Sequence, residues 1–136
     1  MRRPLALLCL PLFATLLTAC GSTAAKAPFT GEKHEVAQTI ANLQTDATAA
    51  EQKKICADDI AAAVVARLGG SKRCEAAIKS QLAEVDNLET SVKSVDVTAV
   101  GKTATAQVKS IHEGKTATSS VSLVKEGGKW KISGVG

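Results

Sequence analysis

The sequence predicts an α+β domain in which N-terminal helices pack on one face of a four-stranded antiparallel sheet. Two observations predict this class. Apolar residues recur every three or four positions from about residue 30 onwards, and after Glu89 they alternate with polar residues instead. A length of 136 residues favours a single domain, and contents of 45% hydrophobic and 22% charged residues are typical of a globular chain.

The first 19 residues are expected to be a leader that is removed before the protein reaches its final location. Arg2 and Arg3 form a positively charged start, and Leu5 to Leu17 form an apolar stretch that is short for a membrane span. The stretch ends in L-T-A-C at Cys20, which resembles the lipobox of bacterial lipoproteins. An ordinary secretory signal that has a cysteine at its small-residue end is the alternative.

The lipobox resemblance implies cleavage before Cys20, a diacylglyceryl thioether on its sulfur and an acylated amine, with palmitate among the expected fatty acids. The mature chain would then be anchored to the cell membrane at its extracytoplasmic face. Residues 20–29 are expected to be the lipidated cysteine and a flexible tether, because positions 21–28 are small and polar without an apolar period. Residues 30–136 remain for the folded domain.

The charge pattern argues against a nucleic-acid partner. Cleavage of the leader removes Arg2 and Arg3, which lowers the formal net charge from +4 to +2. The lysines are spread as single residues or short pairs, and the aromatic residues are few, namely Phe13, Phe29 and Trp130. Nucleic-acid binding surfaces typically combine a basic cluster with stacking aromatic side chains, and neither is present.

Three apolar stripes predict three helices. The first lies between Glu32 and Lys54, with its apolar residues at Val36, Ile40, Leu43, Ala47 and Ala50. The second runs through Cys56, Ile60, Val64 and Leu68 and ends at Gly69-Gly70, where glycine favours a helix C-terminus. The third starts after Ser71, a favourable N-cap, and continues through Cys74, Ile78, Leu82 and Val85.

Cys56 and Cys74 are expected to form a disulfide bond. Cys9 lies in the leader and Cys20 would carry lipid, so these two cysteines remain, and disulfides persist outside the cytoplasm. Both cysteines also fall on the apolar faces of their helices, which are the faces that pack together. A pair of free thiols and a metal site are the alternatives, but His34 and His112 do not supply a zinc-binding spacing.

Period-two alternation predicts four strands joined by hairpin turns. The runs cover Val95 to Ala99, Ala104 to Lys109, Ala117 to Leu123 and Lys129 to Ser133, with Trp130 and Ile132 facing the same side. The turns fall at Gly101-Lys102, Glu113-Gly114 and Gly127-Gly128, where a positive backbone angle is needed. The expected sheet is a four-stranded meander.

This order of elements, together with the spacing of the two cysteines and the ending G-G-K-W-K-I-S, resembles the small NTF2-like lipoproteins of bacteria over about Thr30 to Val135. The resemblance implies a cone in which a concave sheet and helices enclose a pocket. Members of the family include enzymes and binding modules, so the fold alone does not decide the activity. A cystatin-like or other helix-on-sheet arrangement is the alternative.

The sequence contains no recognisable catalytic or cofactor motif. His112 is the best candidate base, with Asp96 as a nearby acid, but its place next to a turn predicts an exposed loop tip. His34 and the pair Asp58-Asp59 are interpreted as solvated charges at helix starts. The alternating hydroxyl residues Thr116, Thr118, Ser120 and Ser122 are interpreted as a solvent-facing strand surface, with a patch for a glycan or partner strand as the alternative.

The sequence therefore predicts a membrane-anchored, non-catalytic module that binds a small apolar ligand or an envelope protein, without cofactor or metal. Two alternatives remain open at this point. One is a structural subunit of an envelope complex, with a homodimer formed through the sheet as one form of it. The other is a small enzyme that uses His112.

Overall fold

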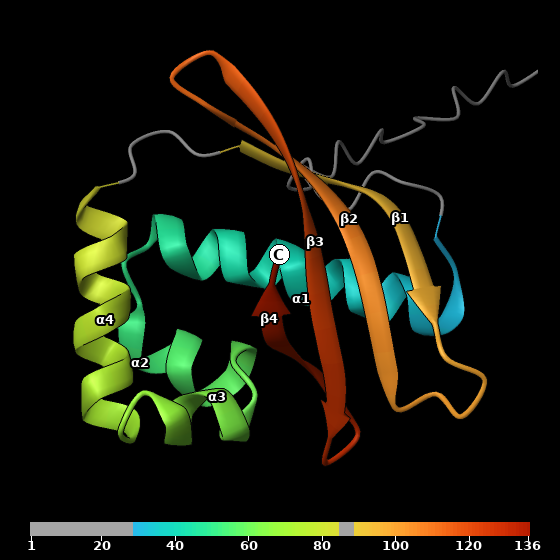
Figure 1. Cartoon of the computed structure of the whole chain (residues 1–136), viewed down its shortest axis with the longest axis horizontal. Helices are drawn as coiled ribbons and strands as arrows, with labels where there is room; N and C mark the ends of the chain where they lie inside the picture. Colours follow the sequence, from blue (N-terminus) through green and yellow to red (C-terminus); the bar gives the residue numbers. More distant parts are fainter. Residues whose placement is uncertain (1–28, 85–88) are drawn as a thin grey trace, which may run out of the picture.

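The computed structural model describes residues 29–84 and 89–136 (Figure 1). The predicted leader, Cys20, most of the tether and Val85 lie outside these residues. In chain order the elements are α1 (Gly31–Thr48), α2 (Gln52–Lys54), the π-helical turn η2 (Ile55–Asp59), α3 (Ala62–Arg67), α4 (Ser71–Ala83), β1 (Glu89–Val97), β2 (Thr103–His112), β3 (Lys115–Glu126) and β4 (Lys129–Val135). The strands form one sheet in the order β1-β2-β3-β4 with every neighbouring pair antiparallel, which confirms the predicted α+β class and the meander.

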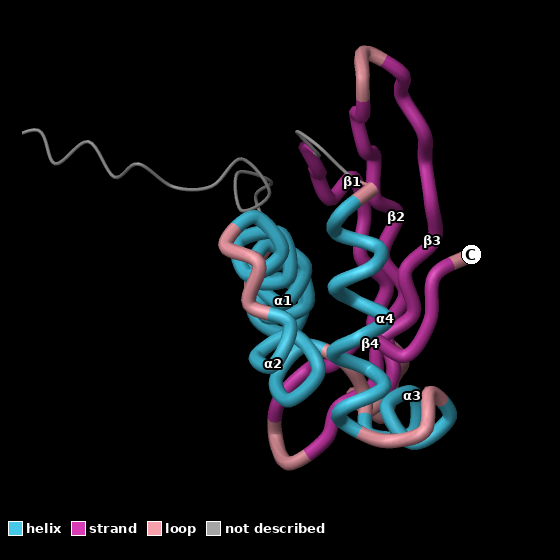
Figure 2. Tube along the Cα trace, turned by 90° about the vertical axis from the view of Figure 1, so that its left-hand side faces the viewer, coloured by secondary structure: helices cyan, strands magenta, loops and turns pink. Residues whose placement is uncertain are grey.

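The helices lie on one side of the sheet, and Figure 2 shows the two layers from the edge. The apolar stripe of α1 supplies Val36 and Ile40 to the core, both of which are buried. The facing side of the sheet supplies the alternate residues of its strands, in agreement with the two-residue period. These buried strand residues are Val92, Val95, Ala104, Ala106, Val108, Val121, Leu123, Trp130 and Ile132.

Trp130 connects the start of α1 with the last two strands. Its indole N–H donates a hydrogen bond of 2.7 Å to Glu32, and the ammonium group of Lys125 lies 5.5 Å from the centre of its ring. Lys125 also pairs with Glu32 at 2.6 Å. The ion pair and the indole bond favour the charged carboxylate and hold the pKa of Glu32 below its usual range.

Two irregularities modify the sheet. The pairing of β1 with β2 shifts register between Val92 and Ser94, and the pairing of β3 with β4 shifts between Ser122 and Leu123. The first shift lets Val92 and Val95 face the core although they are three positions apart. Strand β1 begins at Glu89 and ends at Val97, so Ala99 lies in the following turn and not in a strand as predicted.

Two of the three predicted hairpin turns agree with the structure, whereas the connection between β1 and β2 is a longer loop from Thr98 to Lys102, in which Gly101 has a φ angle of 63°. Gly127 and Gly128 have φ angles of 56° and 80° between β3 and β4, and Glu113 and Gly114 have φ angles of 49° and 75° between β2 and β3. Two consecutive residues with positive φ match the twist of the flanking strands, which is why glycine is favoured there.

The prediction of one continuous helix from Cys56 to Leu68 is wrong. Its residues form η2 and α3 instead, separated by an extended backbone at Ile60, where φ is −98° and ψ is 137°. Ile60 makes a parallel bridge with Ile132, and the Ala61 N–H donates a hydrogen bond of 2.8 Å to the Ile132 carbonyl. This backbone pairing with β4 interrupts the helix, although the side-chain period favours continuation.

The predicted disulfide between Cys56 and Cys74 is present. It joins η2 to α4, the Cα atoms are 6.1 Å apart, and both residues are buried. Among the described residues, no helix is long and apolar enough to cross a membrane.

We expect replacement of both Cys56 and Cys74 by alanine to lower the melting temperature of the oxidised protein by several degrees or more. The bond closes a loop of 18 residues, for which the chain-entropy relation gives about 3 kcal/mol of stabilisation. Thermal unfolding followed by circular dichroism, with and without a reductant, measures the effect. The reductant should lower the wild-type melting temperature and leave the double variant unchanged, and equal melting temperatures for the two oxidised proteins would contradict a stabilising bond.

Candidate functional site

An apolar cavity of about 450 Å³ lies between α1, α4 and the concave face of the sheet. Apolar side chains from all three parts line it, including Ile40, Leu43, Ile55, Ile78, Leu82 and Val121. Polar groups at its wall are few, and two of them satisfy each other, because Thr90 donates a hydrogen bond of 2.6 Å to Gln44. A cavity of this size and lining is typical of a site for a small apolar molecule.

The cavity exists because α4 does not pack directly on the sheet. The main contacts of α4 are with α2, η2 and α3, so its apolar residues Ile78 and Leu82 face the strands across open space and are half-buried. Small residues on the opposite walls, Ala47 on α1 and Ser119 on β3, do not fill that space. The structure thus has a pocket between the helices and the sheet, the place where the family resemblance implies one.

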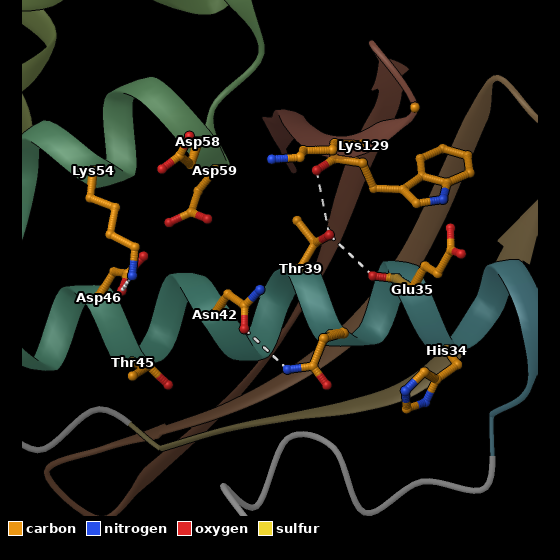
Figure 3. Close-up of a pocket in the computed structure, with 13 residues that line it drawn as sticks. His34, Glu35, Thr39, Asn42, Thr45, Asp46, Lys54, Asp58, Asp59 and Lys129 are labelled. Carbon is orange, nitrogen blue, oxygen red and sulfur yellow. Dashed lines mark hydrogen bonds and ion pairs between the residues drawn. The ribbon is translucent and has the colours of Figure 1, made fainter.

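A second, polar cleft of about 520 Å³ lies on the other face of α1 (Figure 3). Its walls come from α1, from the segment that contains α2 and η2, and from the start of β4. Trp130 closes one end, and its carbonyl group lies 3.4 Å from the Thr39 hydroxyl, which donates to it. The charged residues along this cleft are His34, Glu35, Asp46, Lys54, Asp58, Asp59 and Lys129.

Two buried carboxyl groups meet in this cleft. Asp46 on α1 is 3% exposed and Asp59 on η2 is 5% exposed, and Figure 3 shows the Asp59 carboxyl group pointing from η2 toward α1. The Lys54 ammonium group lies 2.7 Å from Asp46 Oδ1. The other oxygen of each carboxyl group, Asp46 Oδ2 and Asp59 Oδ2, is buried and has no hydrogen-bond partner among the described residues.

Burial of Asp59 and the neighbouring carboxylate of Asp46 raise the pKa of Asp59 to about 7. The charged form loses hydration in the interior, and a second negative charge nearby adds repulsion. Lys54 acts in the opposite direction but is already bound to Asp46. At neutral pH, Asp59 is therefore divided between its protonated and ionised forms.

The interpretation of Asp58-Asp59 as solvated charges at a helix start is wrong for Asp59. Asp58 is exposed, but Asp59 is buried at the end of η2 and faces Asp46, thirteen positions earlier in the chain. The carboxyl pair is thus formed by Asp46 and Asp59 and not by adjacent residues. No sequence signal identified Asp46, because it lies on the polar side of the α1 stripe like any solvated residue.

His112 does not lie near its candidate acid, Asp96. His112 is half-buried at the end of β2 and not at an exposed loop tip as predicted, and its Nε2 is buried without a hydrogen-bond partner among the described residues. Asp96 is exposed and pairs with Thr105, seven positions from His112 along β2, which corresponds to about 23 Å. His34 is exposed in the first turn of α1, as predicted.

The hydroxyl residues of β3 lie mainly in solvent. Thr116, Thr118 and Ser122 are exposed and Ser120 is half-buried, whereas Val121 and Leu123 on the other face are buried. Within residues 29–84 and 89–136, no three histidine, cysteine or acidic side chains are grouped closely enough to hold a metal ion.

We expect the free energy of unfolding to decrease as the pH rises from about 4 to about 7, and Asp59→Asn to remove this decrease. The folded protein binds the Asp59 proton more tightly than the unfolded chain does. This tighter binding stabilises the folded state fully below the pKa of Asp59 in the unfolded chain, and the stabilisation is lost as the pH rises through about 7. The shift of about three pKa units, at about 1.4 kcal/mol each, sets an upper limit of about 4 kcal/mol. Because solvent in the cleft screens part of this effect, the substitution should raise the unfolding free energy at pH 8 by about 2 kcal/mol.

Urea unfolding of both proteins at pH 5 and pH 8 measures this difference. Asp96→Asn removes the same charge at an exposed position outside the cleft and serves as the control, which should retain the wild-type pH dependence. A wild-type unfolding free energy that is equal at both pH values would contradict the raised pKa.

No protein-family model and no curated protein matches this chain. Three solved structures are similar to parts of it. A de novo designed protein with a curved β-sheet is 18% identical with a TM-score of 0.40; the match covers 48% of this chain and 61% of the designed chain, which is less than two thirds. A variant of a protein designated Rd1NTF2_05 is 16% identical with a TM-score of 0.49, over 72% of this chain and 91% of that one.

The third is the intermembrane space region of the chloroplast protein ARC6, which is 14% identical with a TM-score of 0.49, over 80% of this chain and 97% of that one. All three likenesses fall below 25% identity and below a TM-score of 0.5. The assignment of this chain to the α+β class therefore rests on its own element order and sheet topology.

Proposed function

We propose that this protein is a non-catalytic binding module that is held at the extracytoplasmic face of the cell membrane by lipid on Cys20 and takes a small apolar ligand into its cavity. The observation that supports ligand binding most directly is the apolar cavity between α1, α4 and the sheet. Its volume of about 450 Å³ suits a small molecule, and apolar walls favour transfer of such a molecule from water.

The position of the cavity also supports this proposal. Its walls belong to regular elements, since α1 and α4 are helices and β2 and β3 are long paired strands. The disulfide bond connects the η2 wall with the α4 wall, so these two parts of the site are covalently joined. A site on such elements is preorganised, which lowers the entropic cost of binding.

The anchor is proposed from the sequence of the leader. The L-T-A-C ending at Cys20 and the small, polar residues after it support a lipid-anchored domain on a short tether. The disulfide between Cys56 and Cys74 is in keeping with an oxidising compartment outside the cytoplasm.

We expect Ala47→Leu to weaken binding of the neutral fluorescent probe N-phenyl-1-naphthylamine at least about tenfold, which corresponds to 1.4 kcal/mol. Ala47 lies on the cavity wall, and three additional carbon atoms there would occupy the space that the probe needs. Fluorescence titration of the purified protein measures the affinity.

Ala63→Leu is the matched control, because Ala63 is exposed on α3 and does not line the cavity. It should bind the probe as the wild type does. Wild-type protein that does not bind the probe, or equal weakening by both substitutions, would argue against ligand binding in this cavity.

We expect Cys20→Ala to abolish incorporation of labelled palmitate and to move the full-length protein out of the membrane fraction of a bacterial host. The thioether that carries the lipid requires the Cys20 sulfur, and the remaining chain has no other proposed anchor. Cys9→Ala, a cysteine change within the leader, is the control and should leave both readouts unchanged. Membrane association that persists in the Cys20 variant would contradict the anchor.

A further inference from the structure

Helix α4 has the position of a lid over the apolar cavity. Ile78 and Leu82 form the part of the cavity wall that faces the strands, yet the main contacts of α4 are with α2, η2 and α3. Figure 1 shows α4 beside α2 and α3, on the side of these helices away from the strands. The placement of α4 over the cavity therefore depends on the segment to which it is attached, and the Cys56–Cys74 bond makes this attachment covalent.

That segment, Gln52 to Asp59, is held on two sides. On one side the backbone just after η2 pairs with β4, through the Ala61 N–H and the Ile132 carbonyl at 2.8 Å, and Lys131 donates a hydrogen bond of 2.7 Å to the Ala57 carbonyl. On the other side it meets α1 through Asp46, which binds Lys54 at 2.7 Å and faces Asp59. The contact with β4 is made by the backbone pairing and by the Lys131 side chain. The contact with α1 also has a backbone hydrogen bond, of 2.9 Å from the Glu51 N–H to the Asp46 carbonyl, but it brings two buried carboxyl groups together.

These carboxyl groups need a donor that the surrounding residues do not supply. Asp46 Oδ2 and Asp59 Oδ2 are both buried, and neither has a hydrogen-bond partner among the described residues. An unpartnered buried carboxylate oxygen is costly, and one proton shared between two facing carboxyl groups supplies the missing donor. We propose that the proton shared by Asp46 and Asp59 is a latch that holds the α4 lid over the apolar cavity, and that its loss releases the lid. This proposal rests on the proposed ligand-binding function of the cavity.

The charges around Asp46 and Asp59 determine how the contact between α1 and η2 responds to loss of the shared proton. In the protonated state, we expect the Asp59 carboxyl group to donate a hydrogen bond to Asp46, while Lys54 neutralises the remaining negative charge. Loss of the proton leaves two buried negative charges for one ammonium group, which also lies 3.6 Å from Glu51. Asp58 on η2 adds further repulsion. The other charged groups of this cleft are His34 and Glu35 on α1 and Lys129 on β4.

The latch is therefore closed in mildly acidic solution and opens as the pH rises through neutrality. The repulsion between the Asp46 and Asp59 carboxylates pushes η2 away from α1. The backbone pairing of Ala61 with Ile132 remains in place, and the segment rotates about it as a hinge. Because Ile55 on η2 and Ile78 and Leu82 on α4 line the cavity, movement of this segment away from α1 widens the cavity. Ligand exchange should then be faster at higher pH.

Hydrogen–deuterium exchange of the α4 amides in the purified protein tests the latch without any ligand. After correction for the intrinsic pH dependence of exchange, we expect the protection of α4 to fall at least about tenfold from pH 6 to pH 8, the factor that corresponds to one pKa unit. In Asp59→Asn the amide group donates permanently to Asp46, so protection should stay high at both pH values. Asp96→Asn, at an exposed position outside this cleft, is the control with the same charge change and should follow the wild type.

Lys54→Met provides an independent test, because removal of this positive charge stabilises the protonated pair and should move the midpoint of the change to higher pH. A general loss of stability would open α4 at every pH and could not produce such a shift. Wild-type protection that does not change with pH, or a change that persists in Asp59→Asn, would overturn the proposal.

Dissociation of N-phenyl-1-naphthylamine, followed by stopped-flow fluorescence, links the latch to the cavity. The rate should increase at least about tenfold from pH 6 to pH 8 in the wild type and remain constant in Asp59→Asn. A wild type that never binds the probe would refute the ligand-binding function, while the exchange of α4 would still decide whether the latch exists. Probe dissociation that is independent of pH, together with pH-dependent α4 exchange, would overturn control of the cavity by the latch.

Discussion

The arrangement of the helices on the sheet depends on the short backbone pairing between Ile60 and β4. The bridge to Ile132 and the hydrogen bond from the Ala61 N–H stop the helical path after Asp59 and restart it at Ala62. Because of this interruption, Asp59 ends its turn facing α1, and Cys56 lies where it can bond to Cys74 on α4. In a continuous helix the side chains would follow one unbroken period. Asp59 would then not face α1, and Cys56 would not lie beside Cys74.

Helix α1 separates two environments of opposite character. One face contributes Ile40, Leu43 and Ala47 to the apolar cavity, while the other contributes Thr39, Asn42 and Asp46 to the polar cleft. Amphipathic helices usually have one buried and one solvated face, but here a second element, the segment of α2 and η2, covers part of the polar face as well. A movement of α1, or of the segment of α2 and η2, in the polar cleft therefore also moves a wall of the apolar cavity.

The buried pair of Asp46 and Asp59 is an unfavourable feature of an otherwise consistent fold. The core under the sheet is apolar and regular, and the indole of Trp130 has its hydrogen-bond partner in Glu32. Two buried carboxyl groups with one ammonium partner, the Lys54 group bound to Asp46, cost stability whenever both are ionised. Local exceptions of this kind are concentrated at functional sites, so the pair marks the polar cleft as a candidate site.

The sequence by itself determined the features that depend on local sequence or on a count of cysteines. These are the apolar stripe of α1, the alternation in the strands, the glycine turns at Glu113-Gly114 and Gly127-Gly128, and the disulfide bond between Cys56 and Cys74. The tertiary structure decided the break at Ile60, the burial of Asp59 against Asp46 and the space under α4. These features arise from contacts between residues far apart in the chain, and such contacts leave no period or spacing in the sequence that could reveal them.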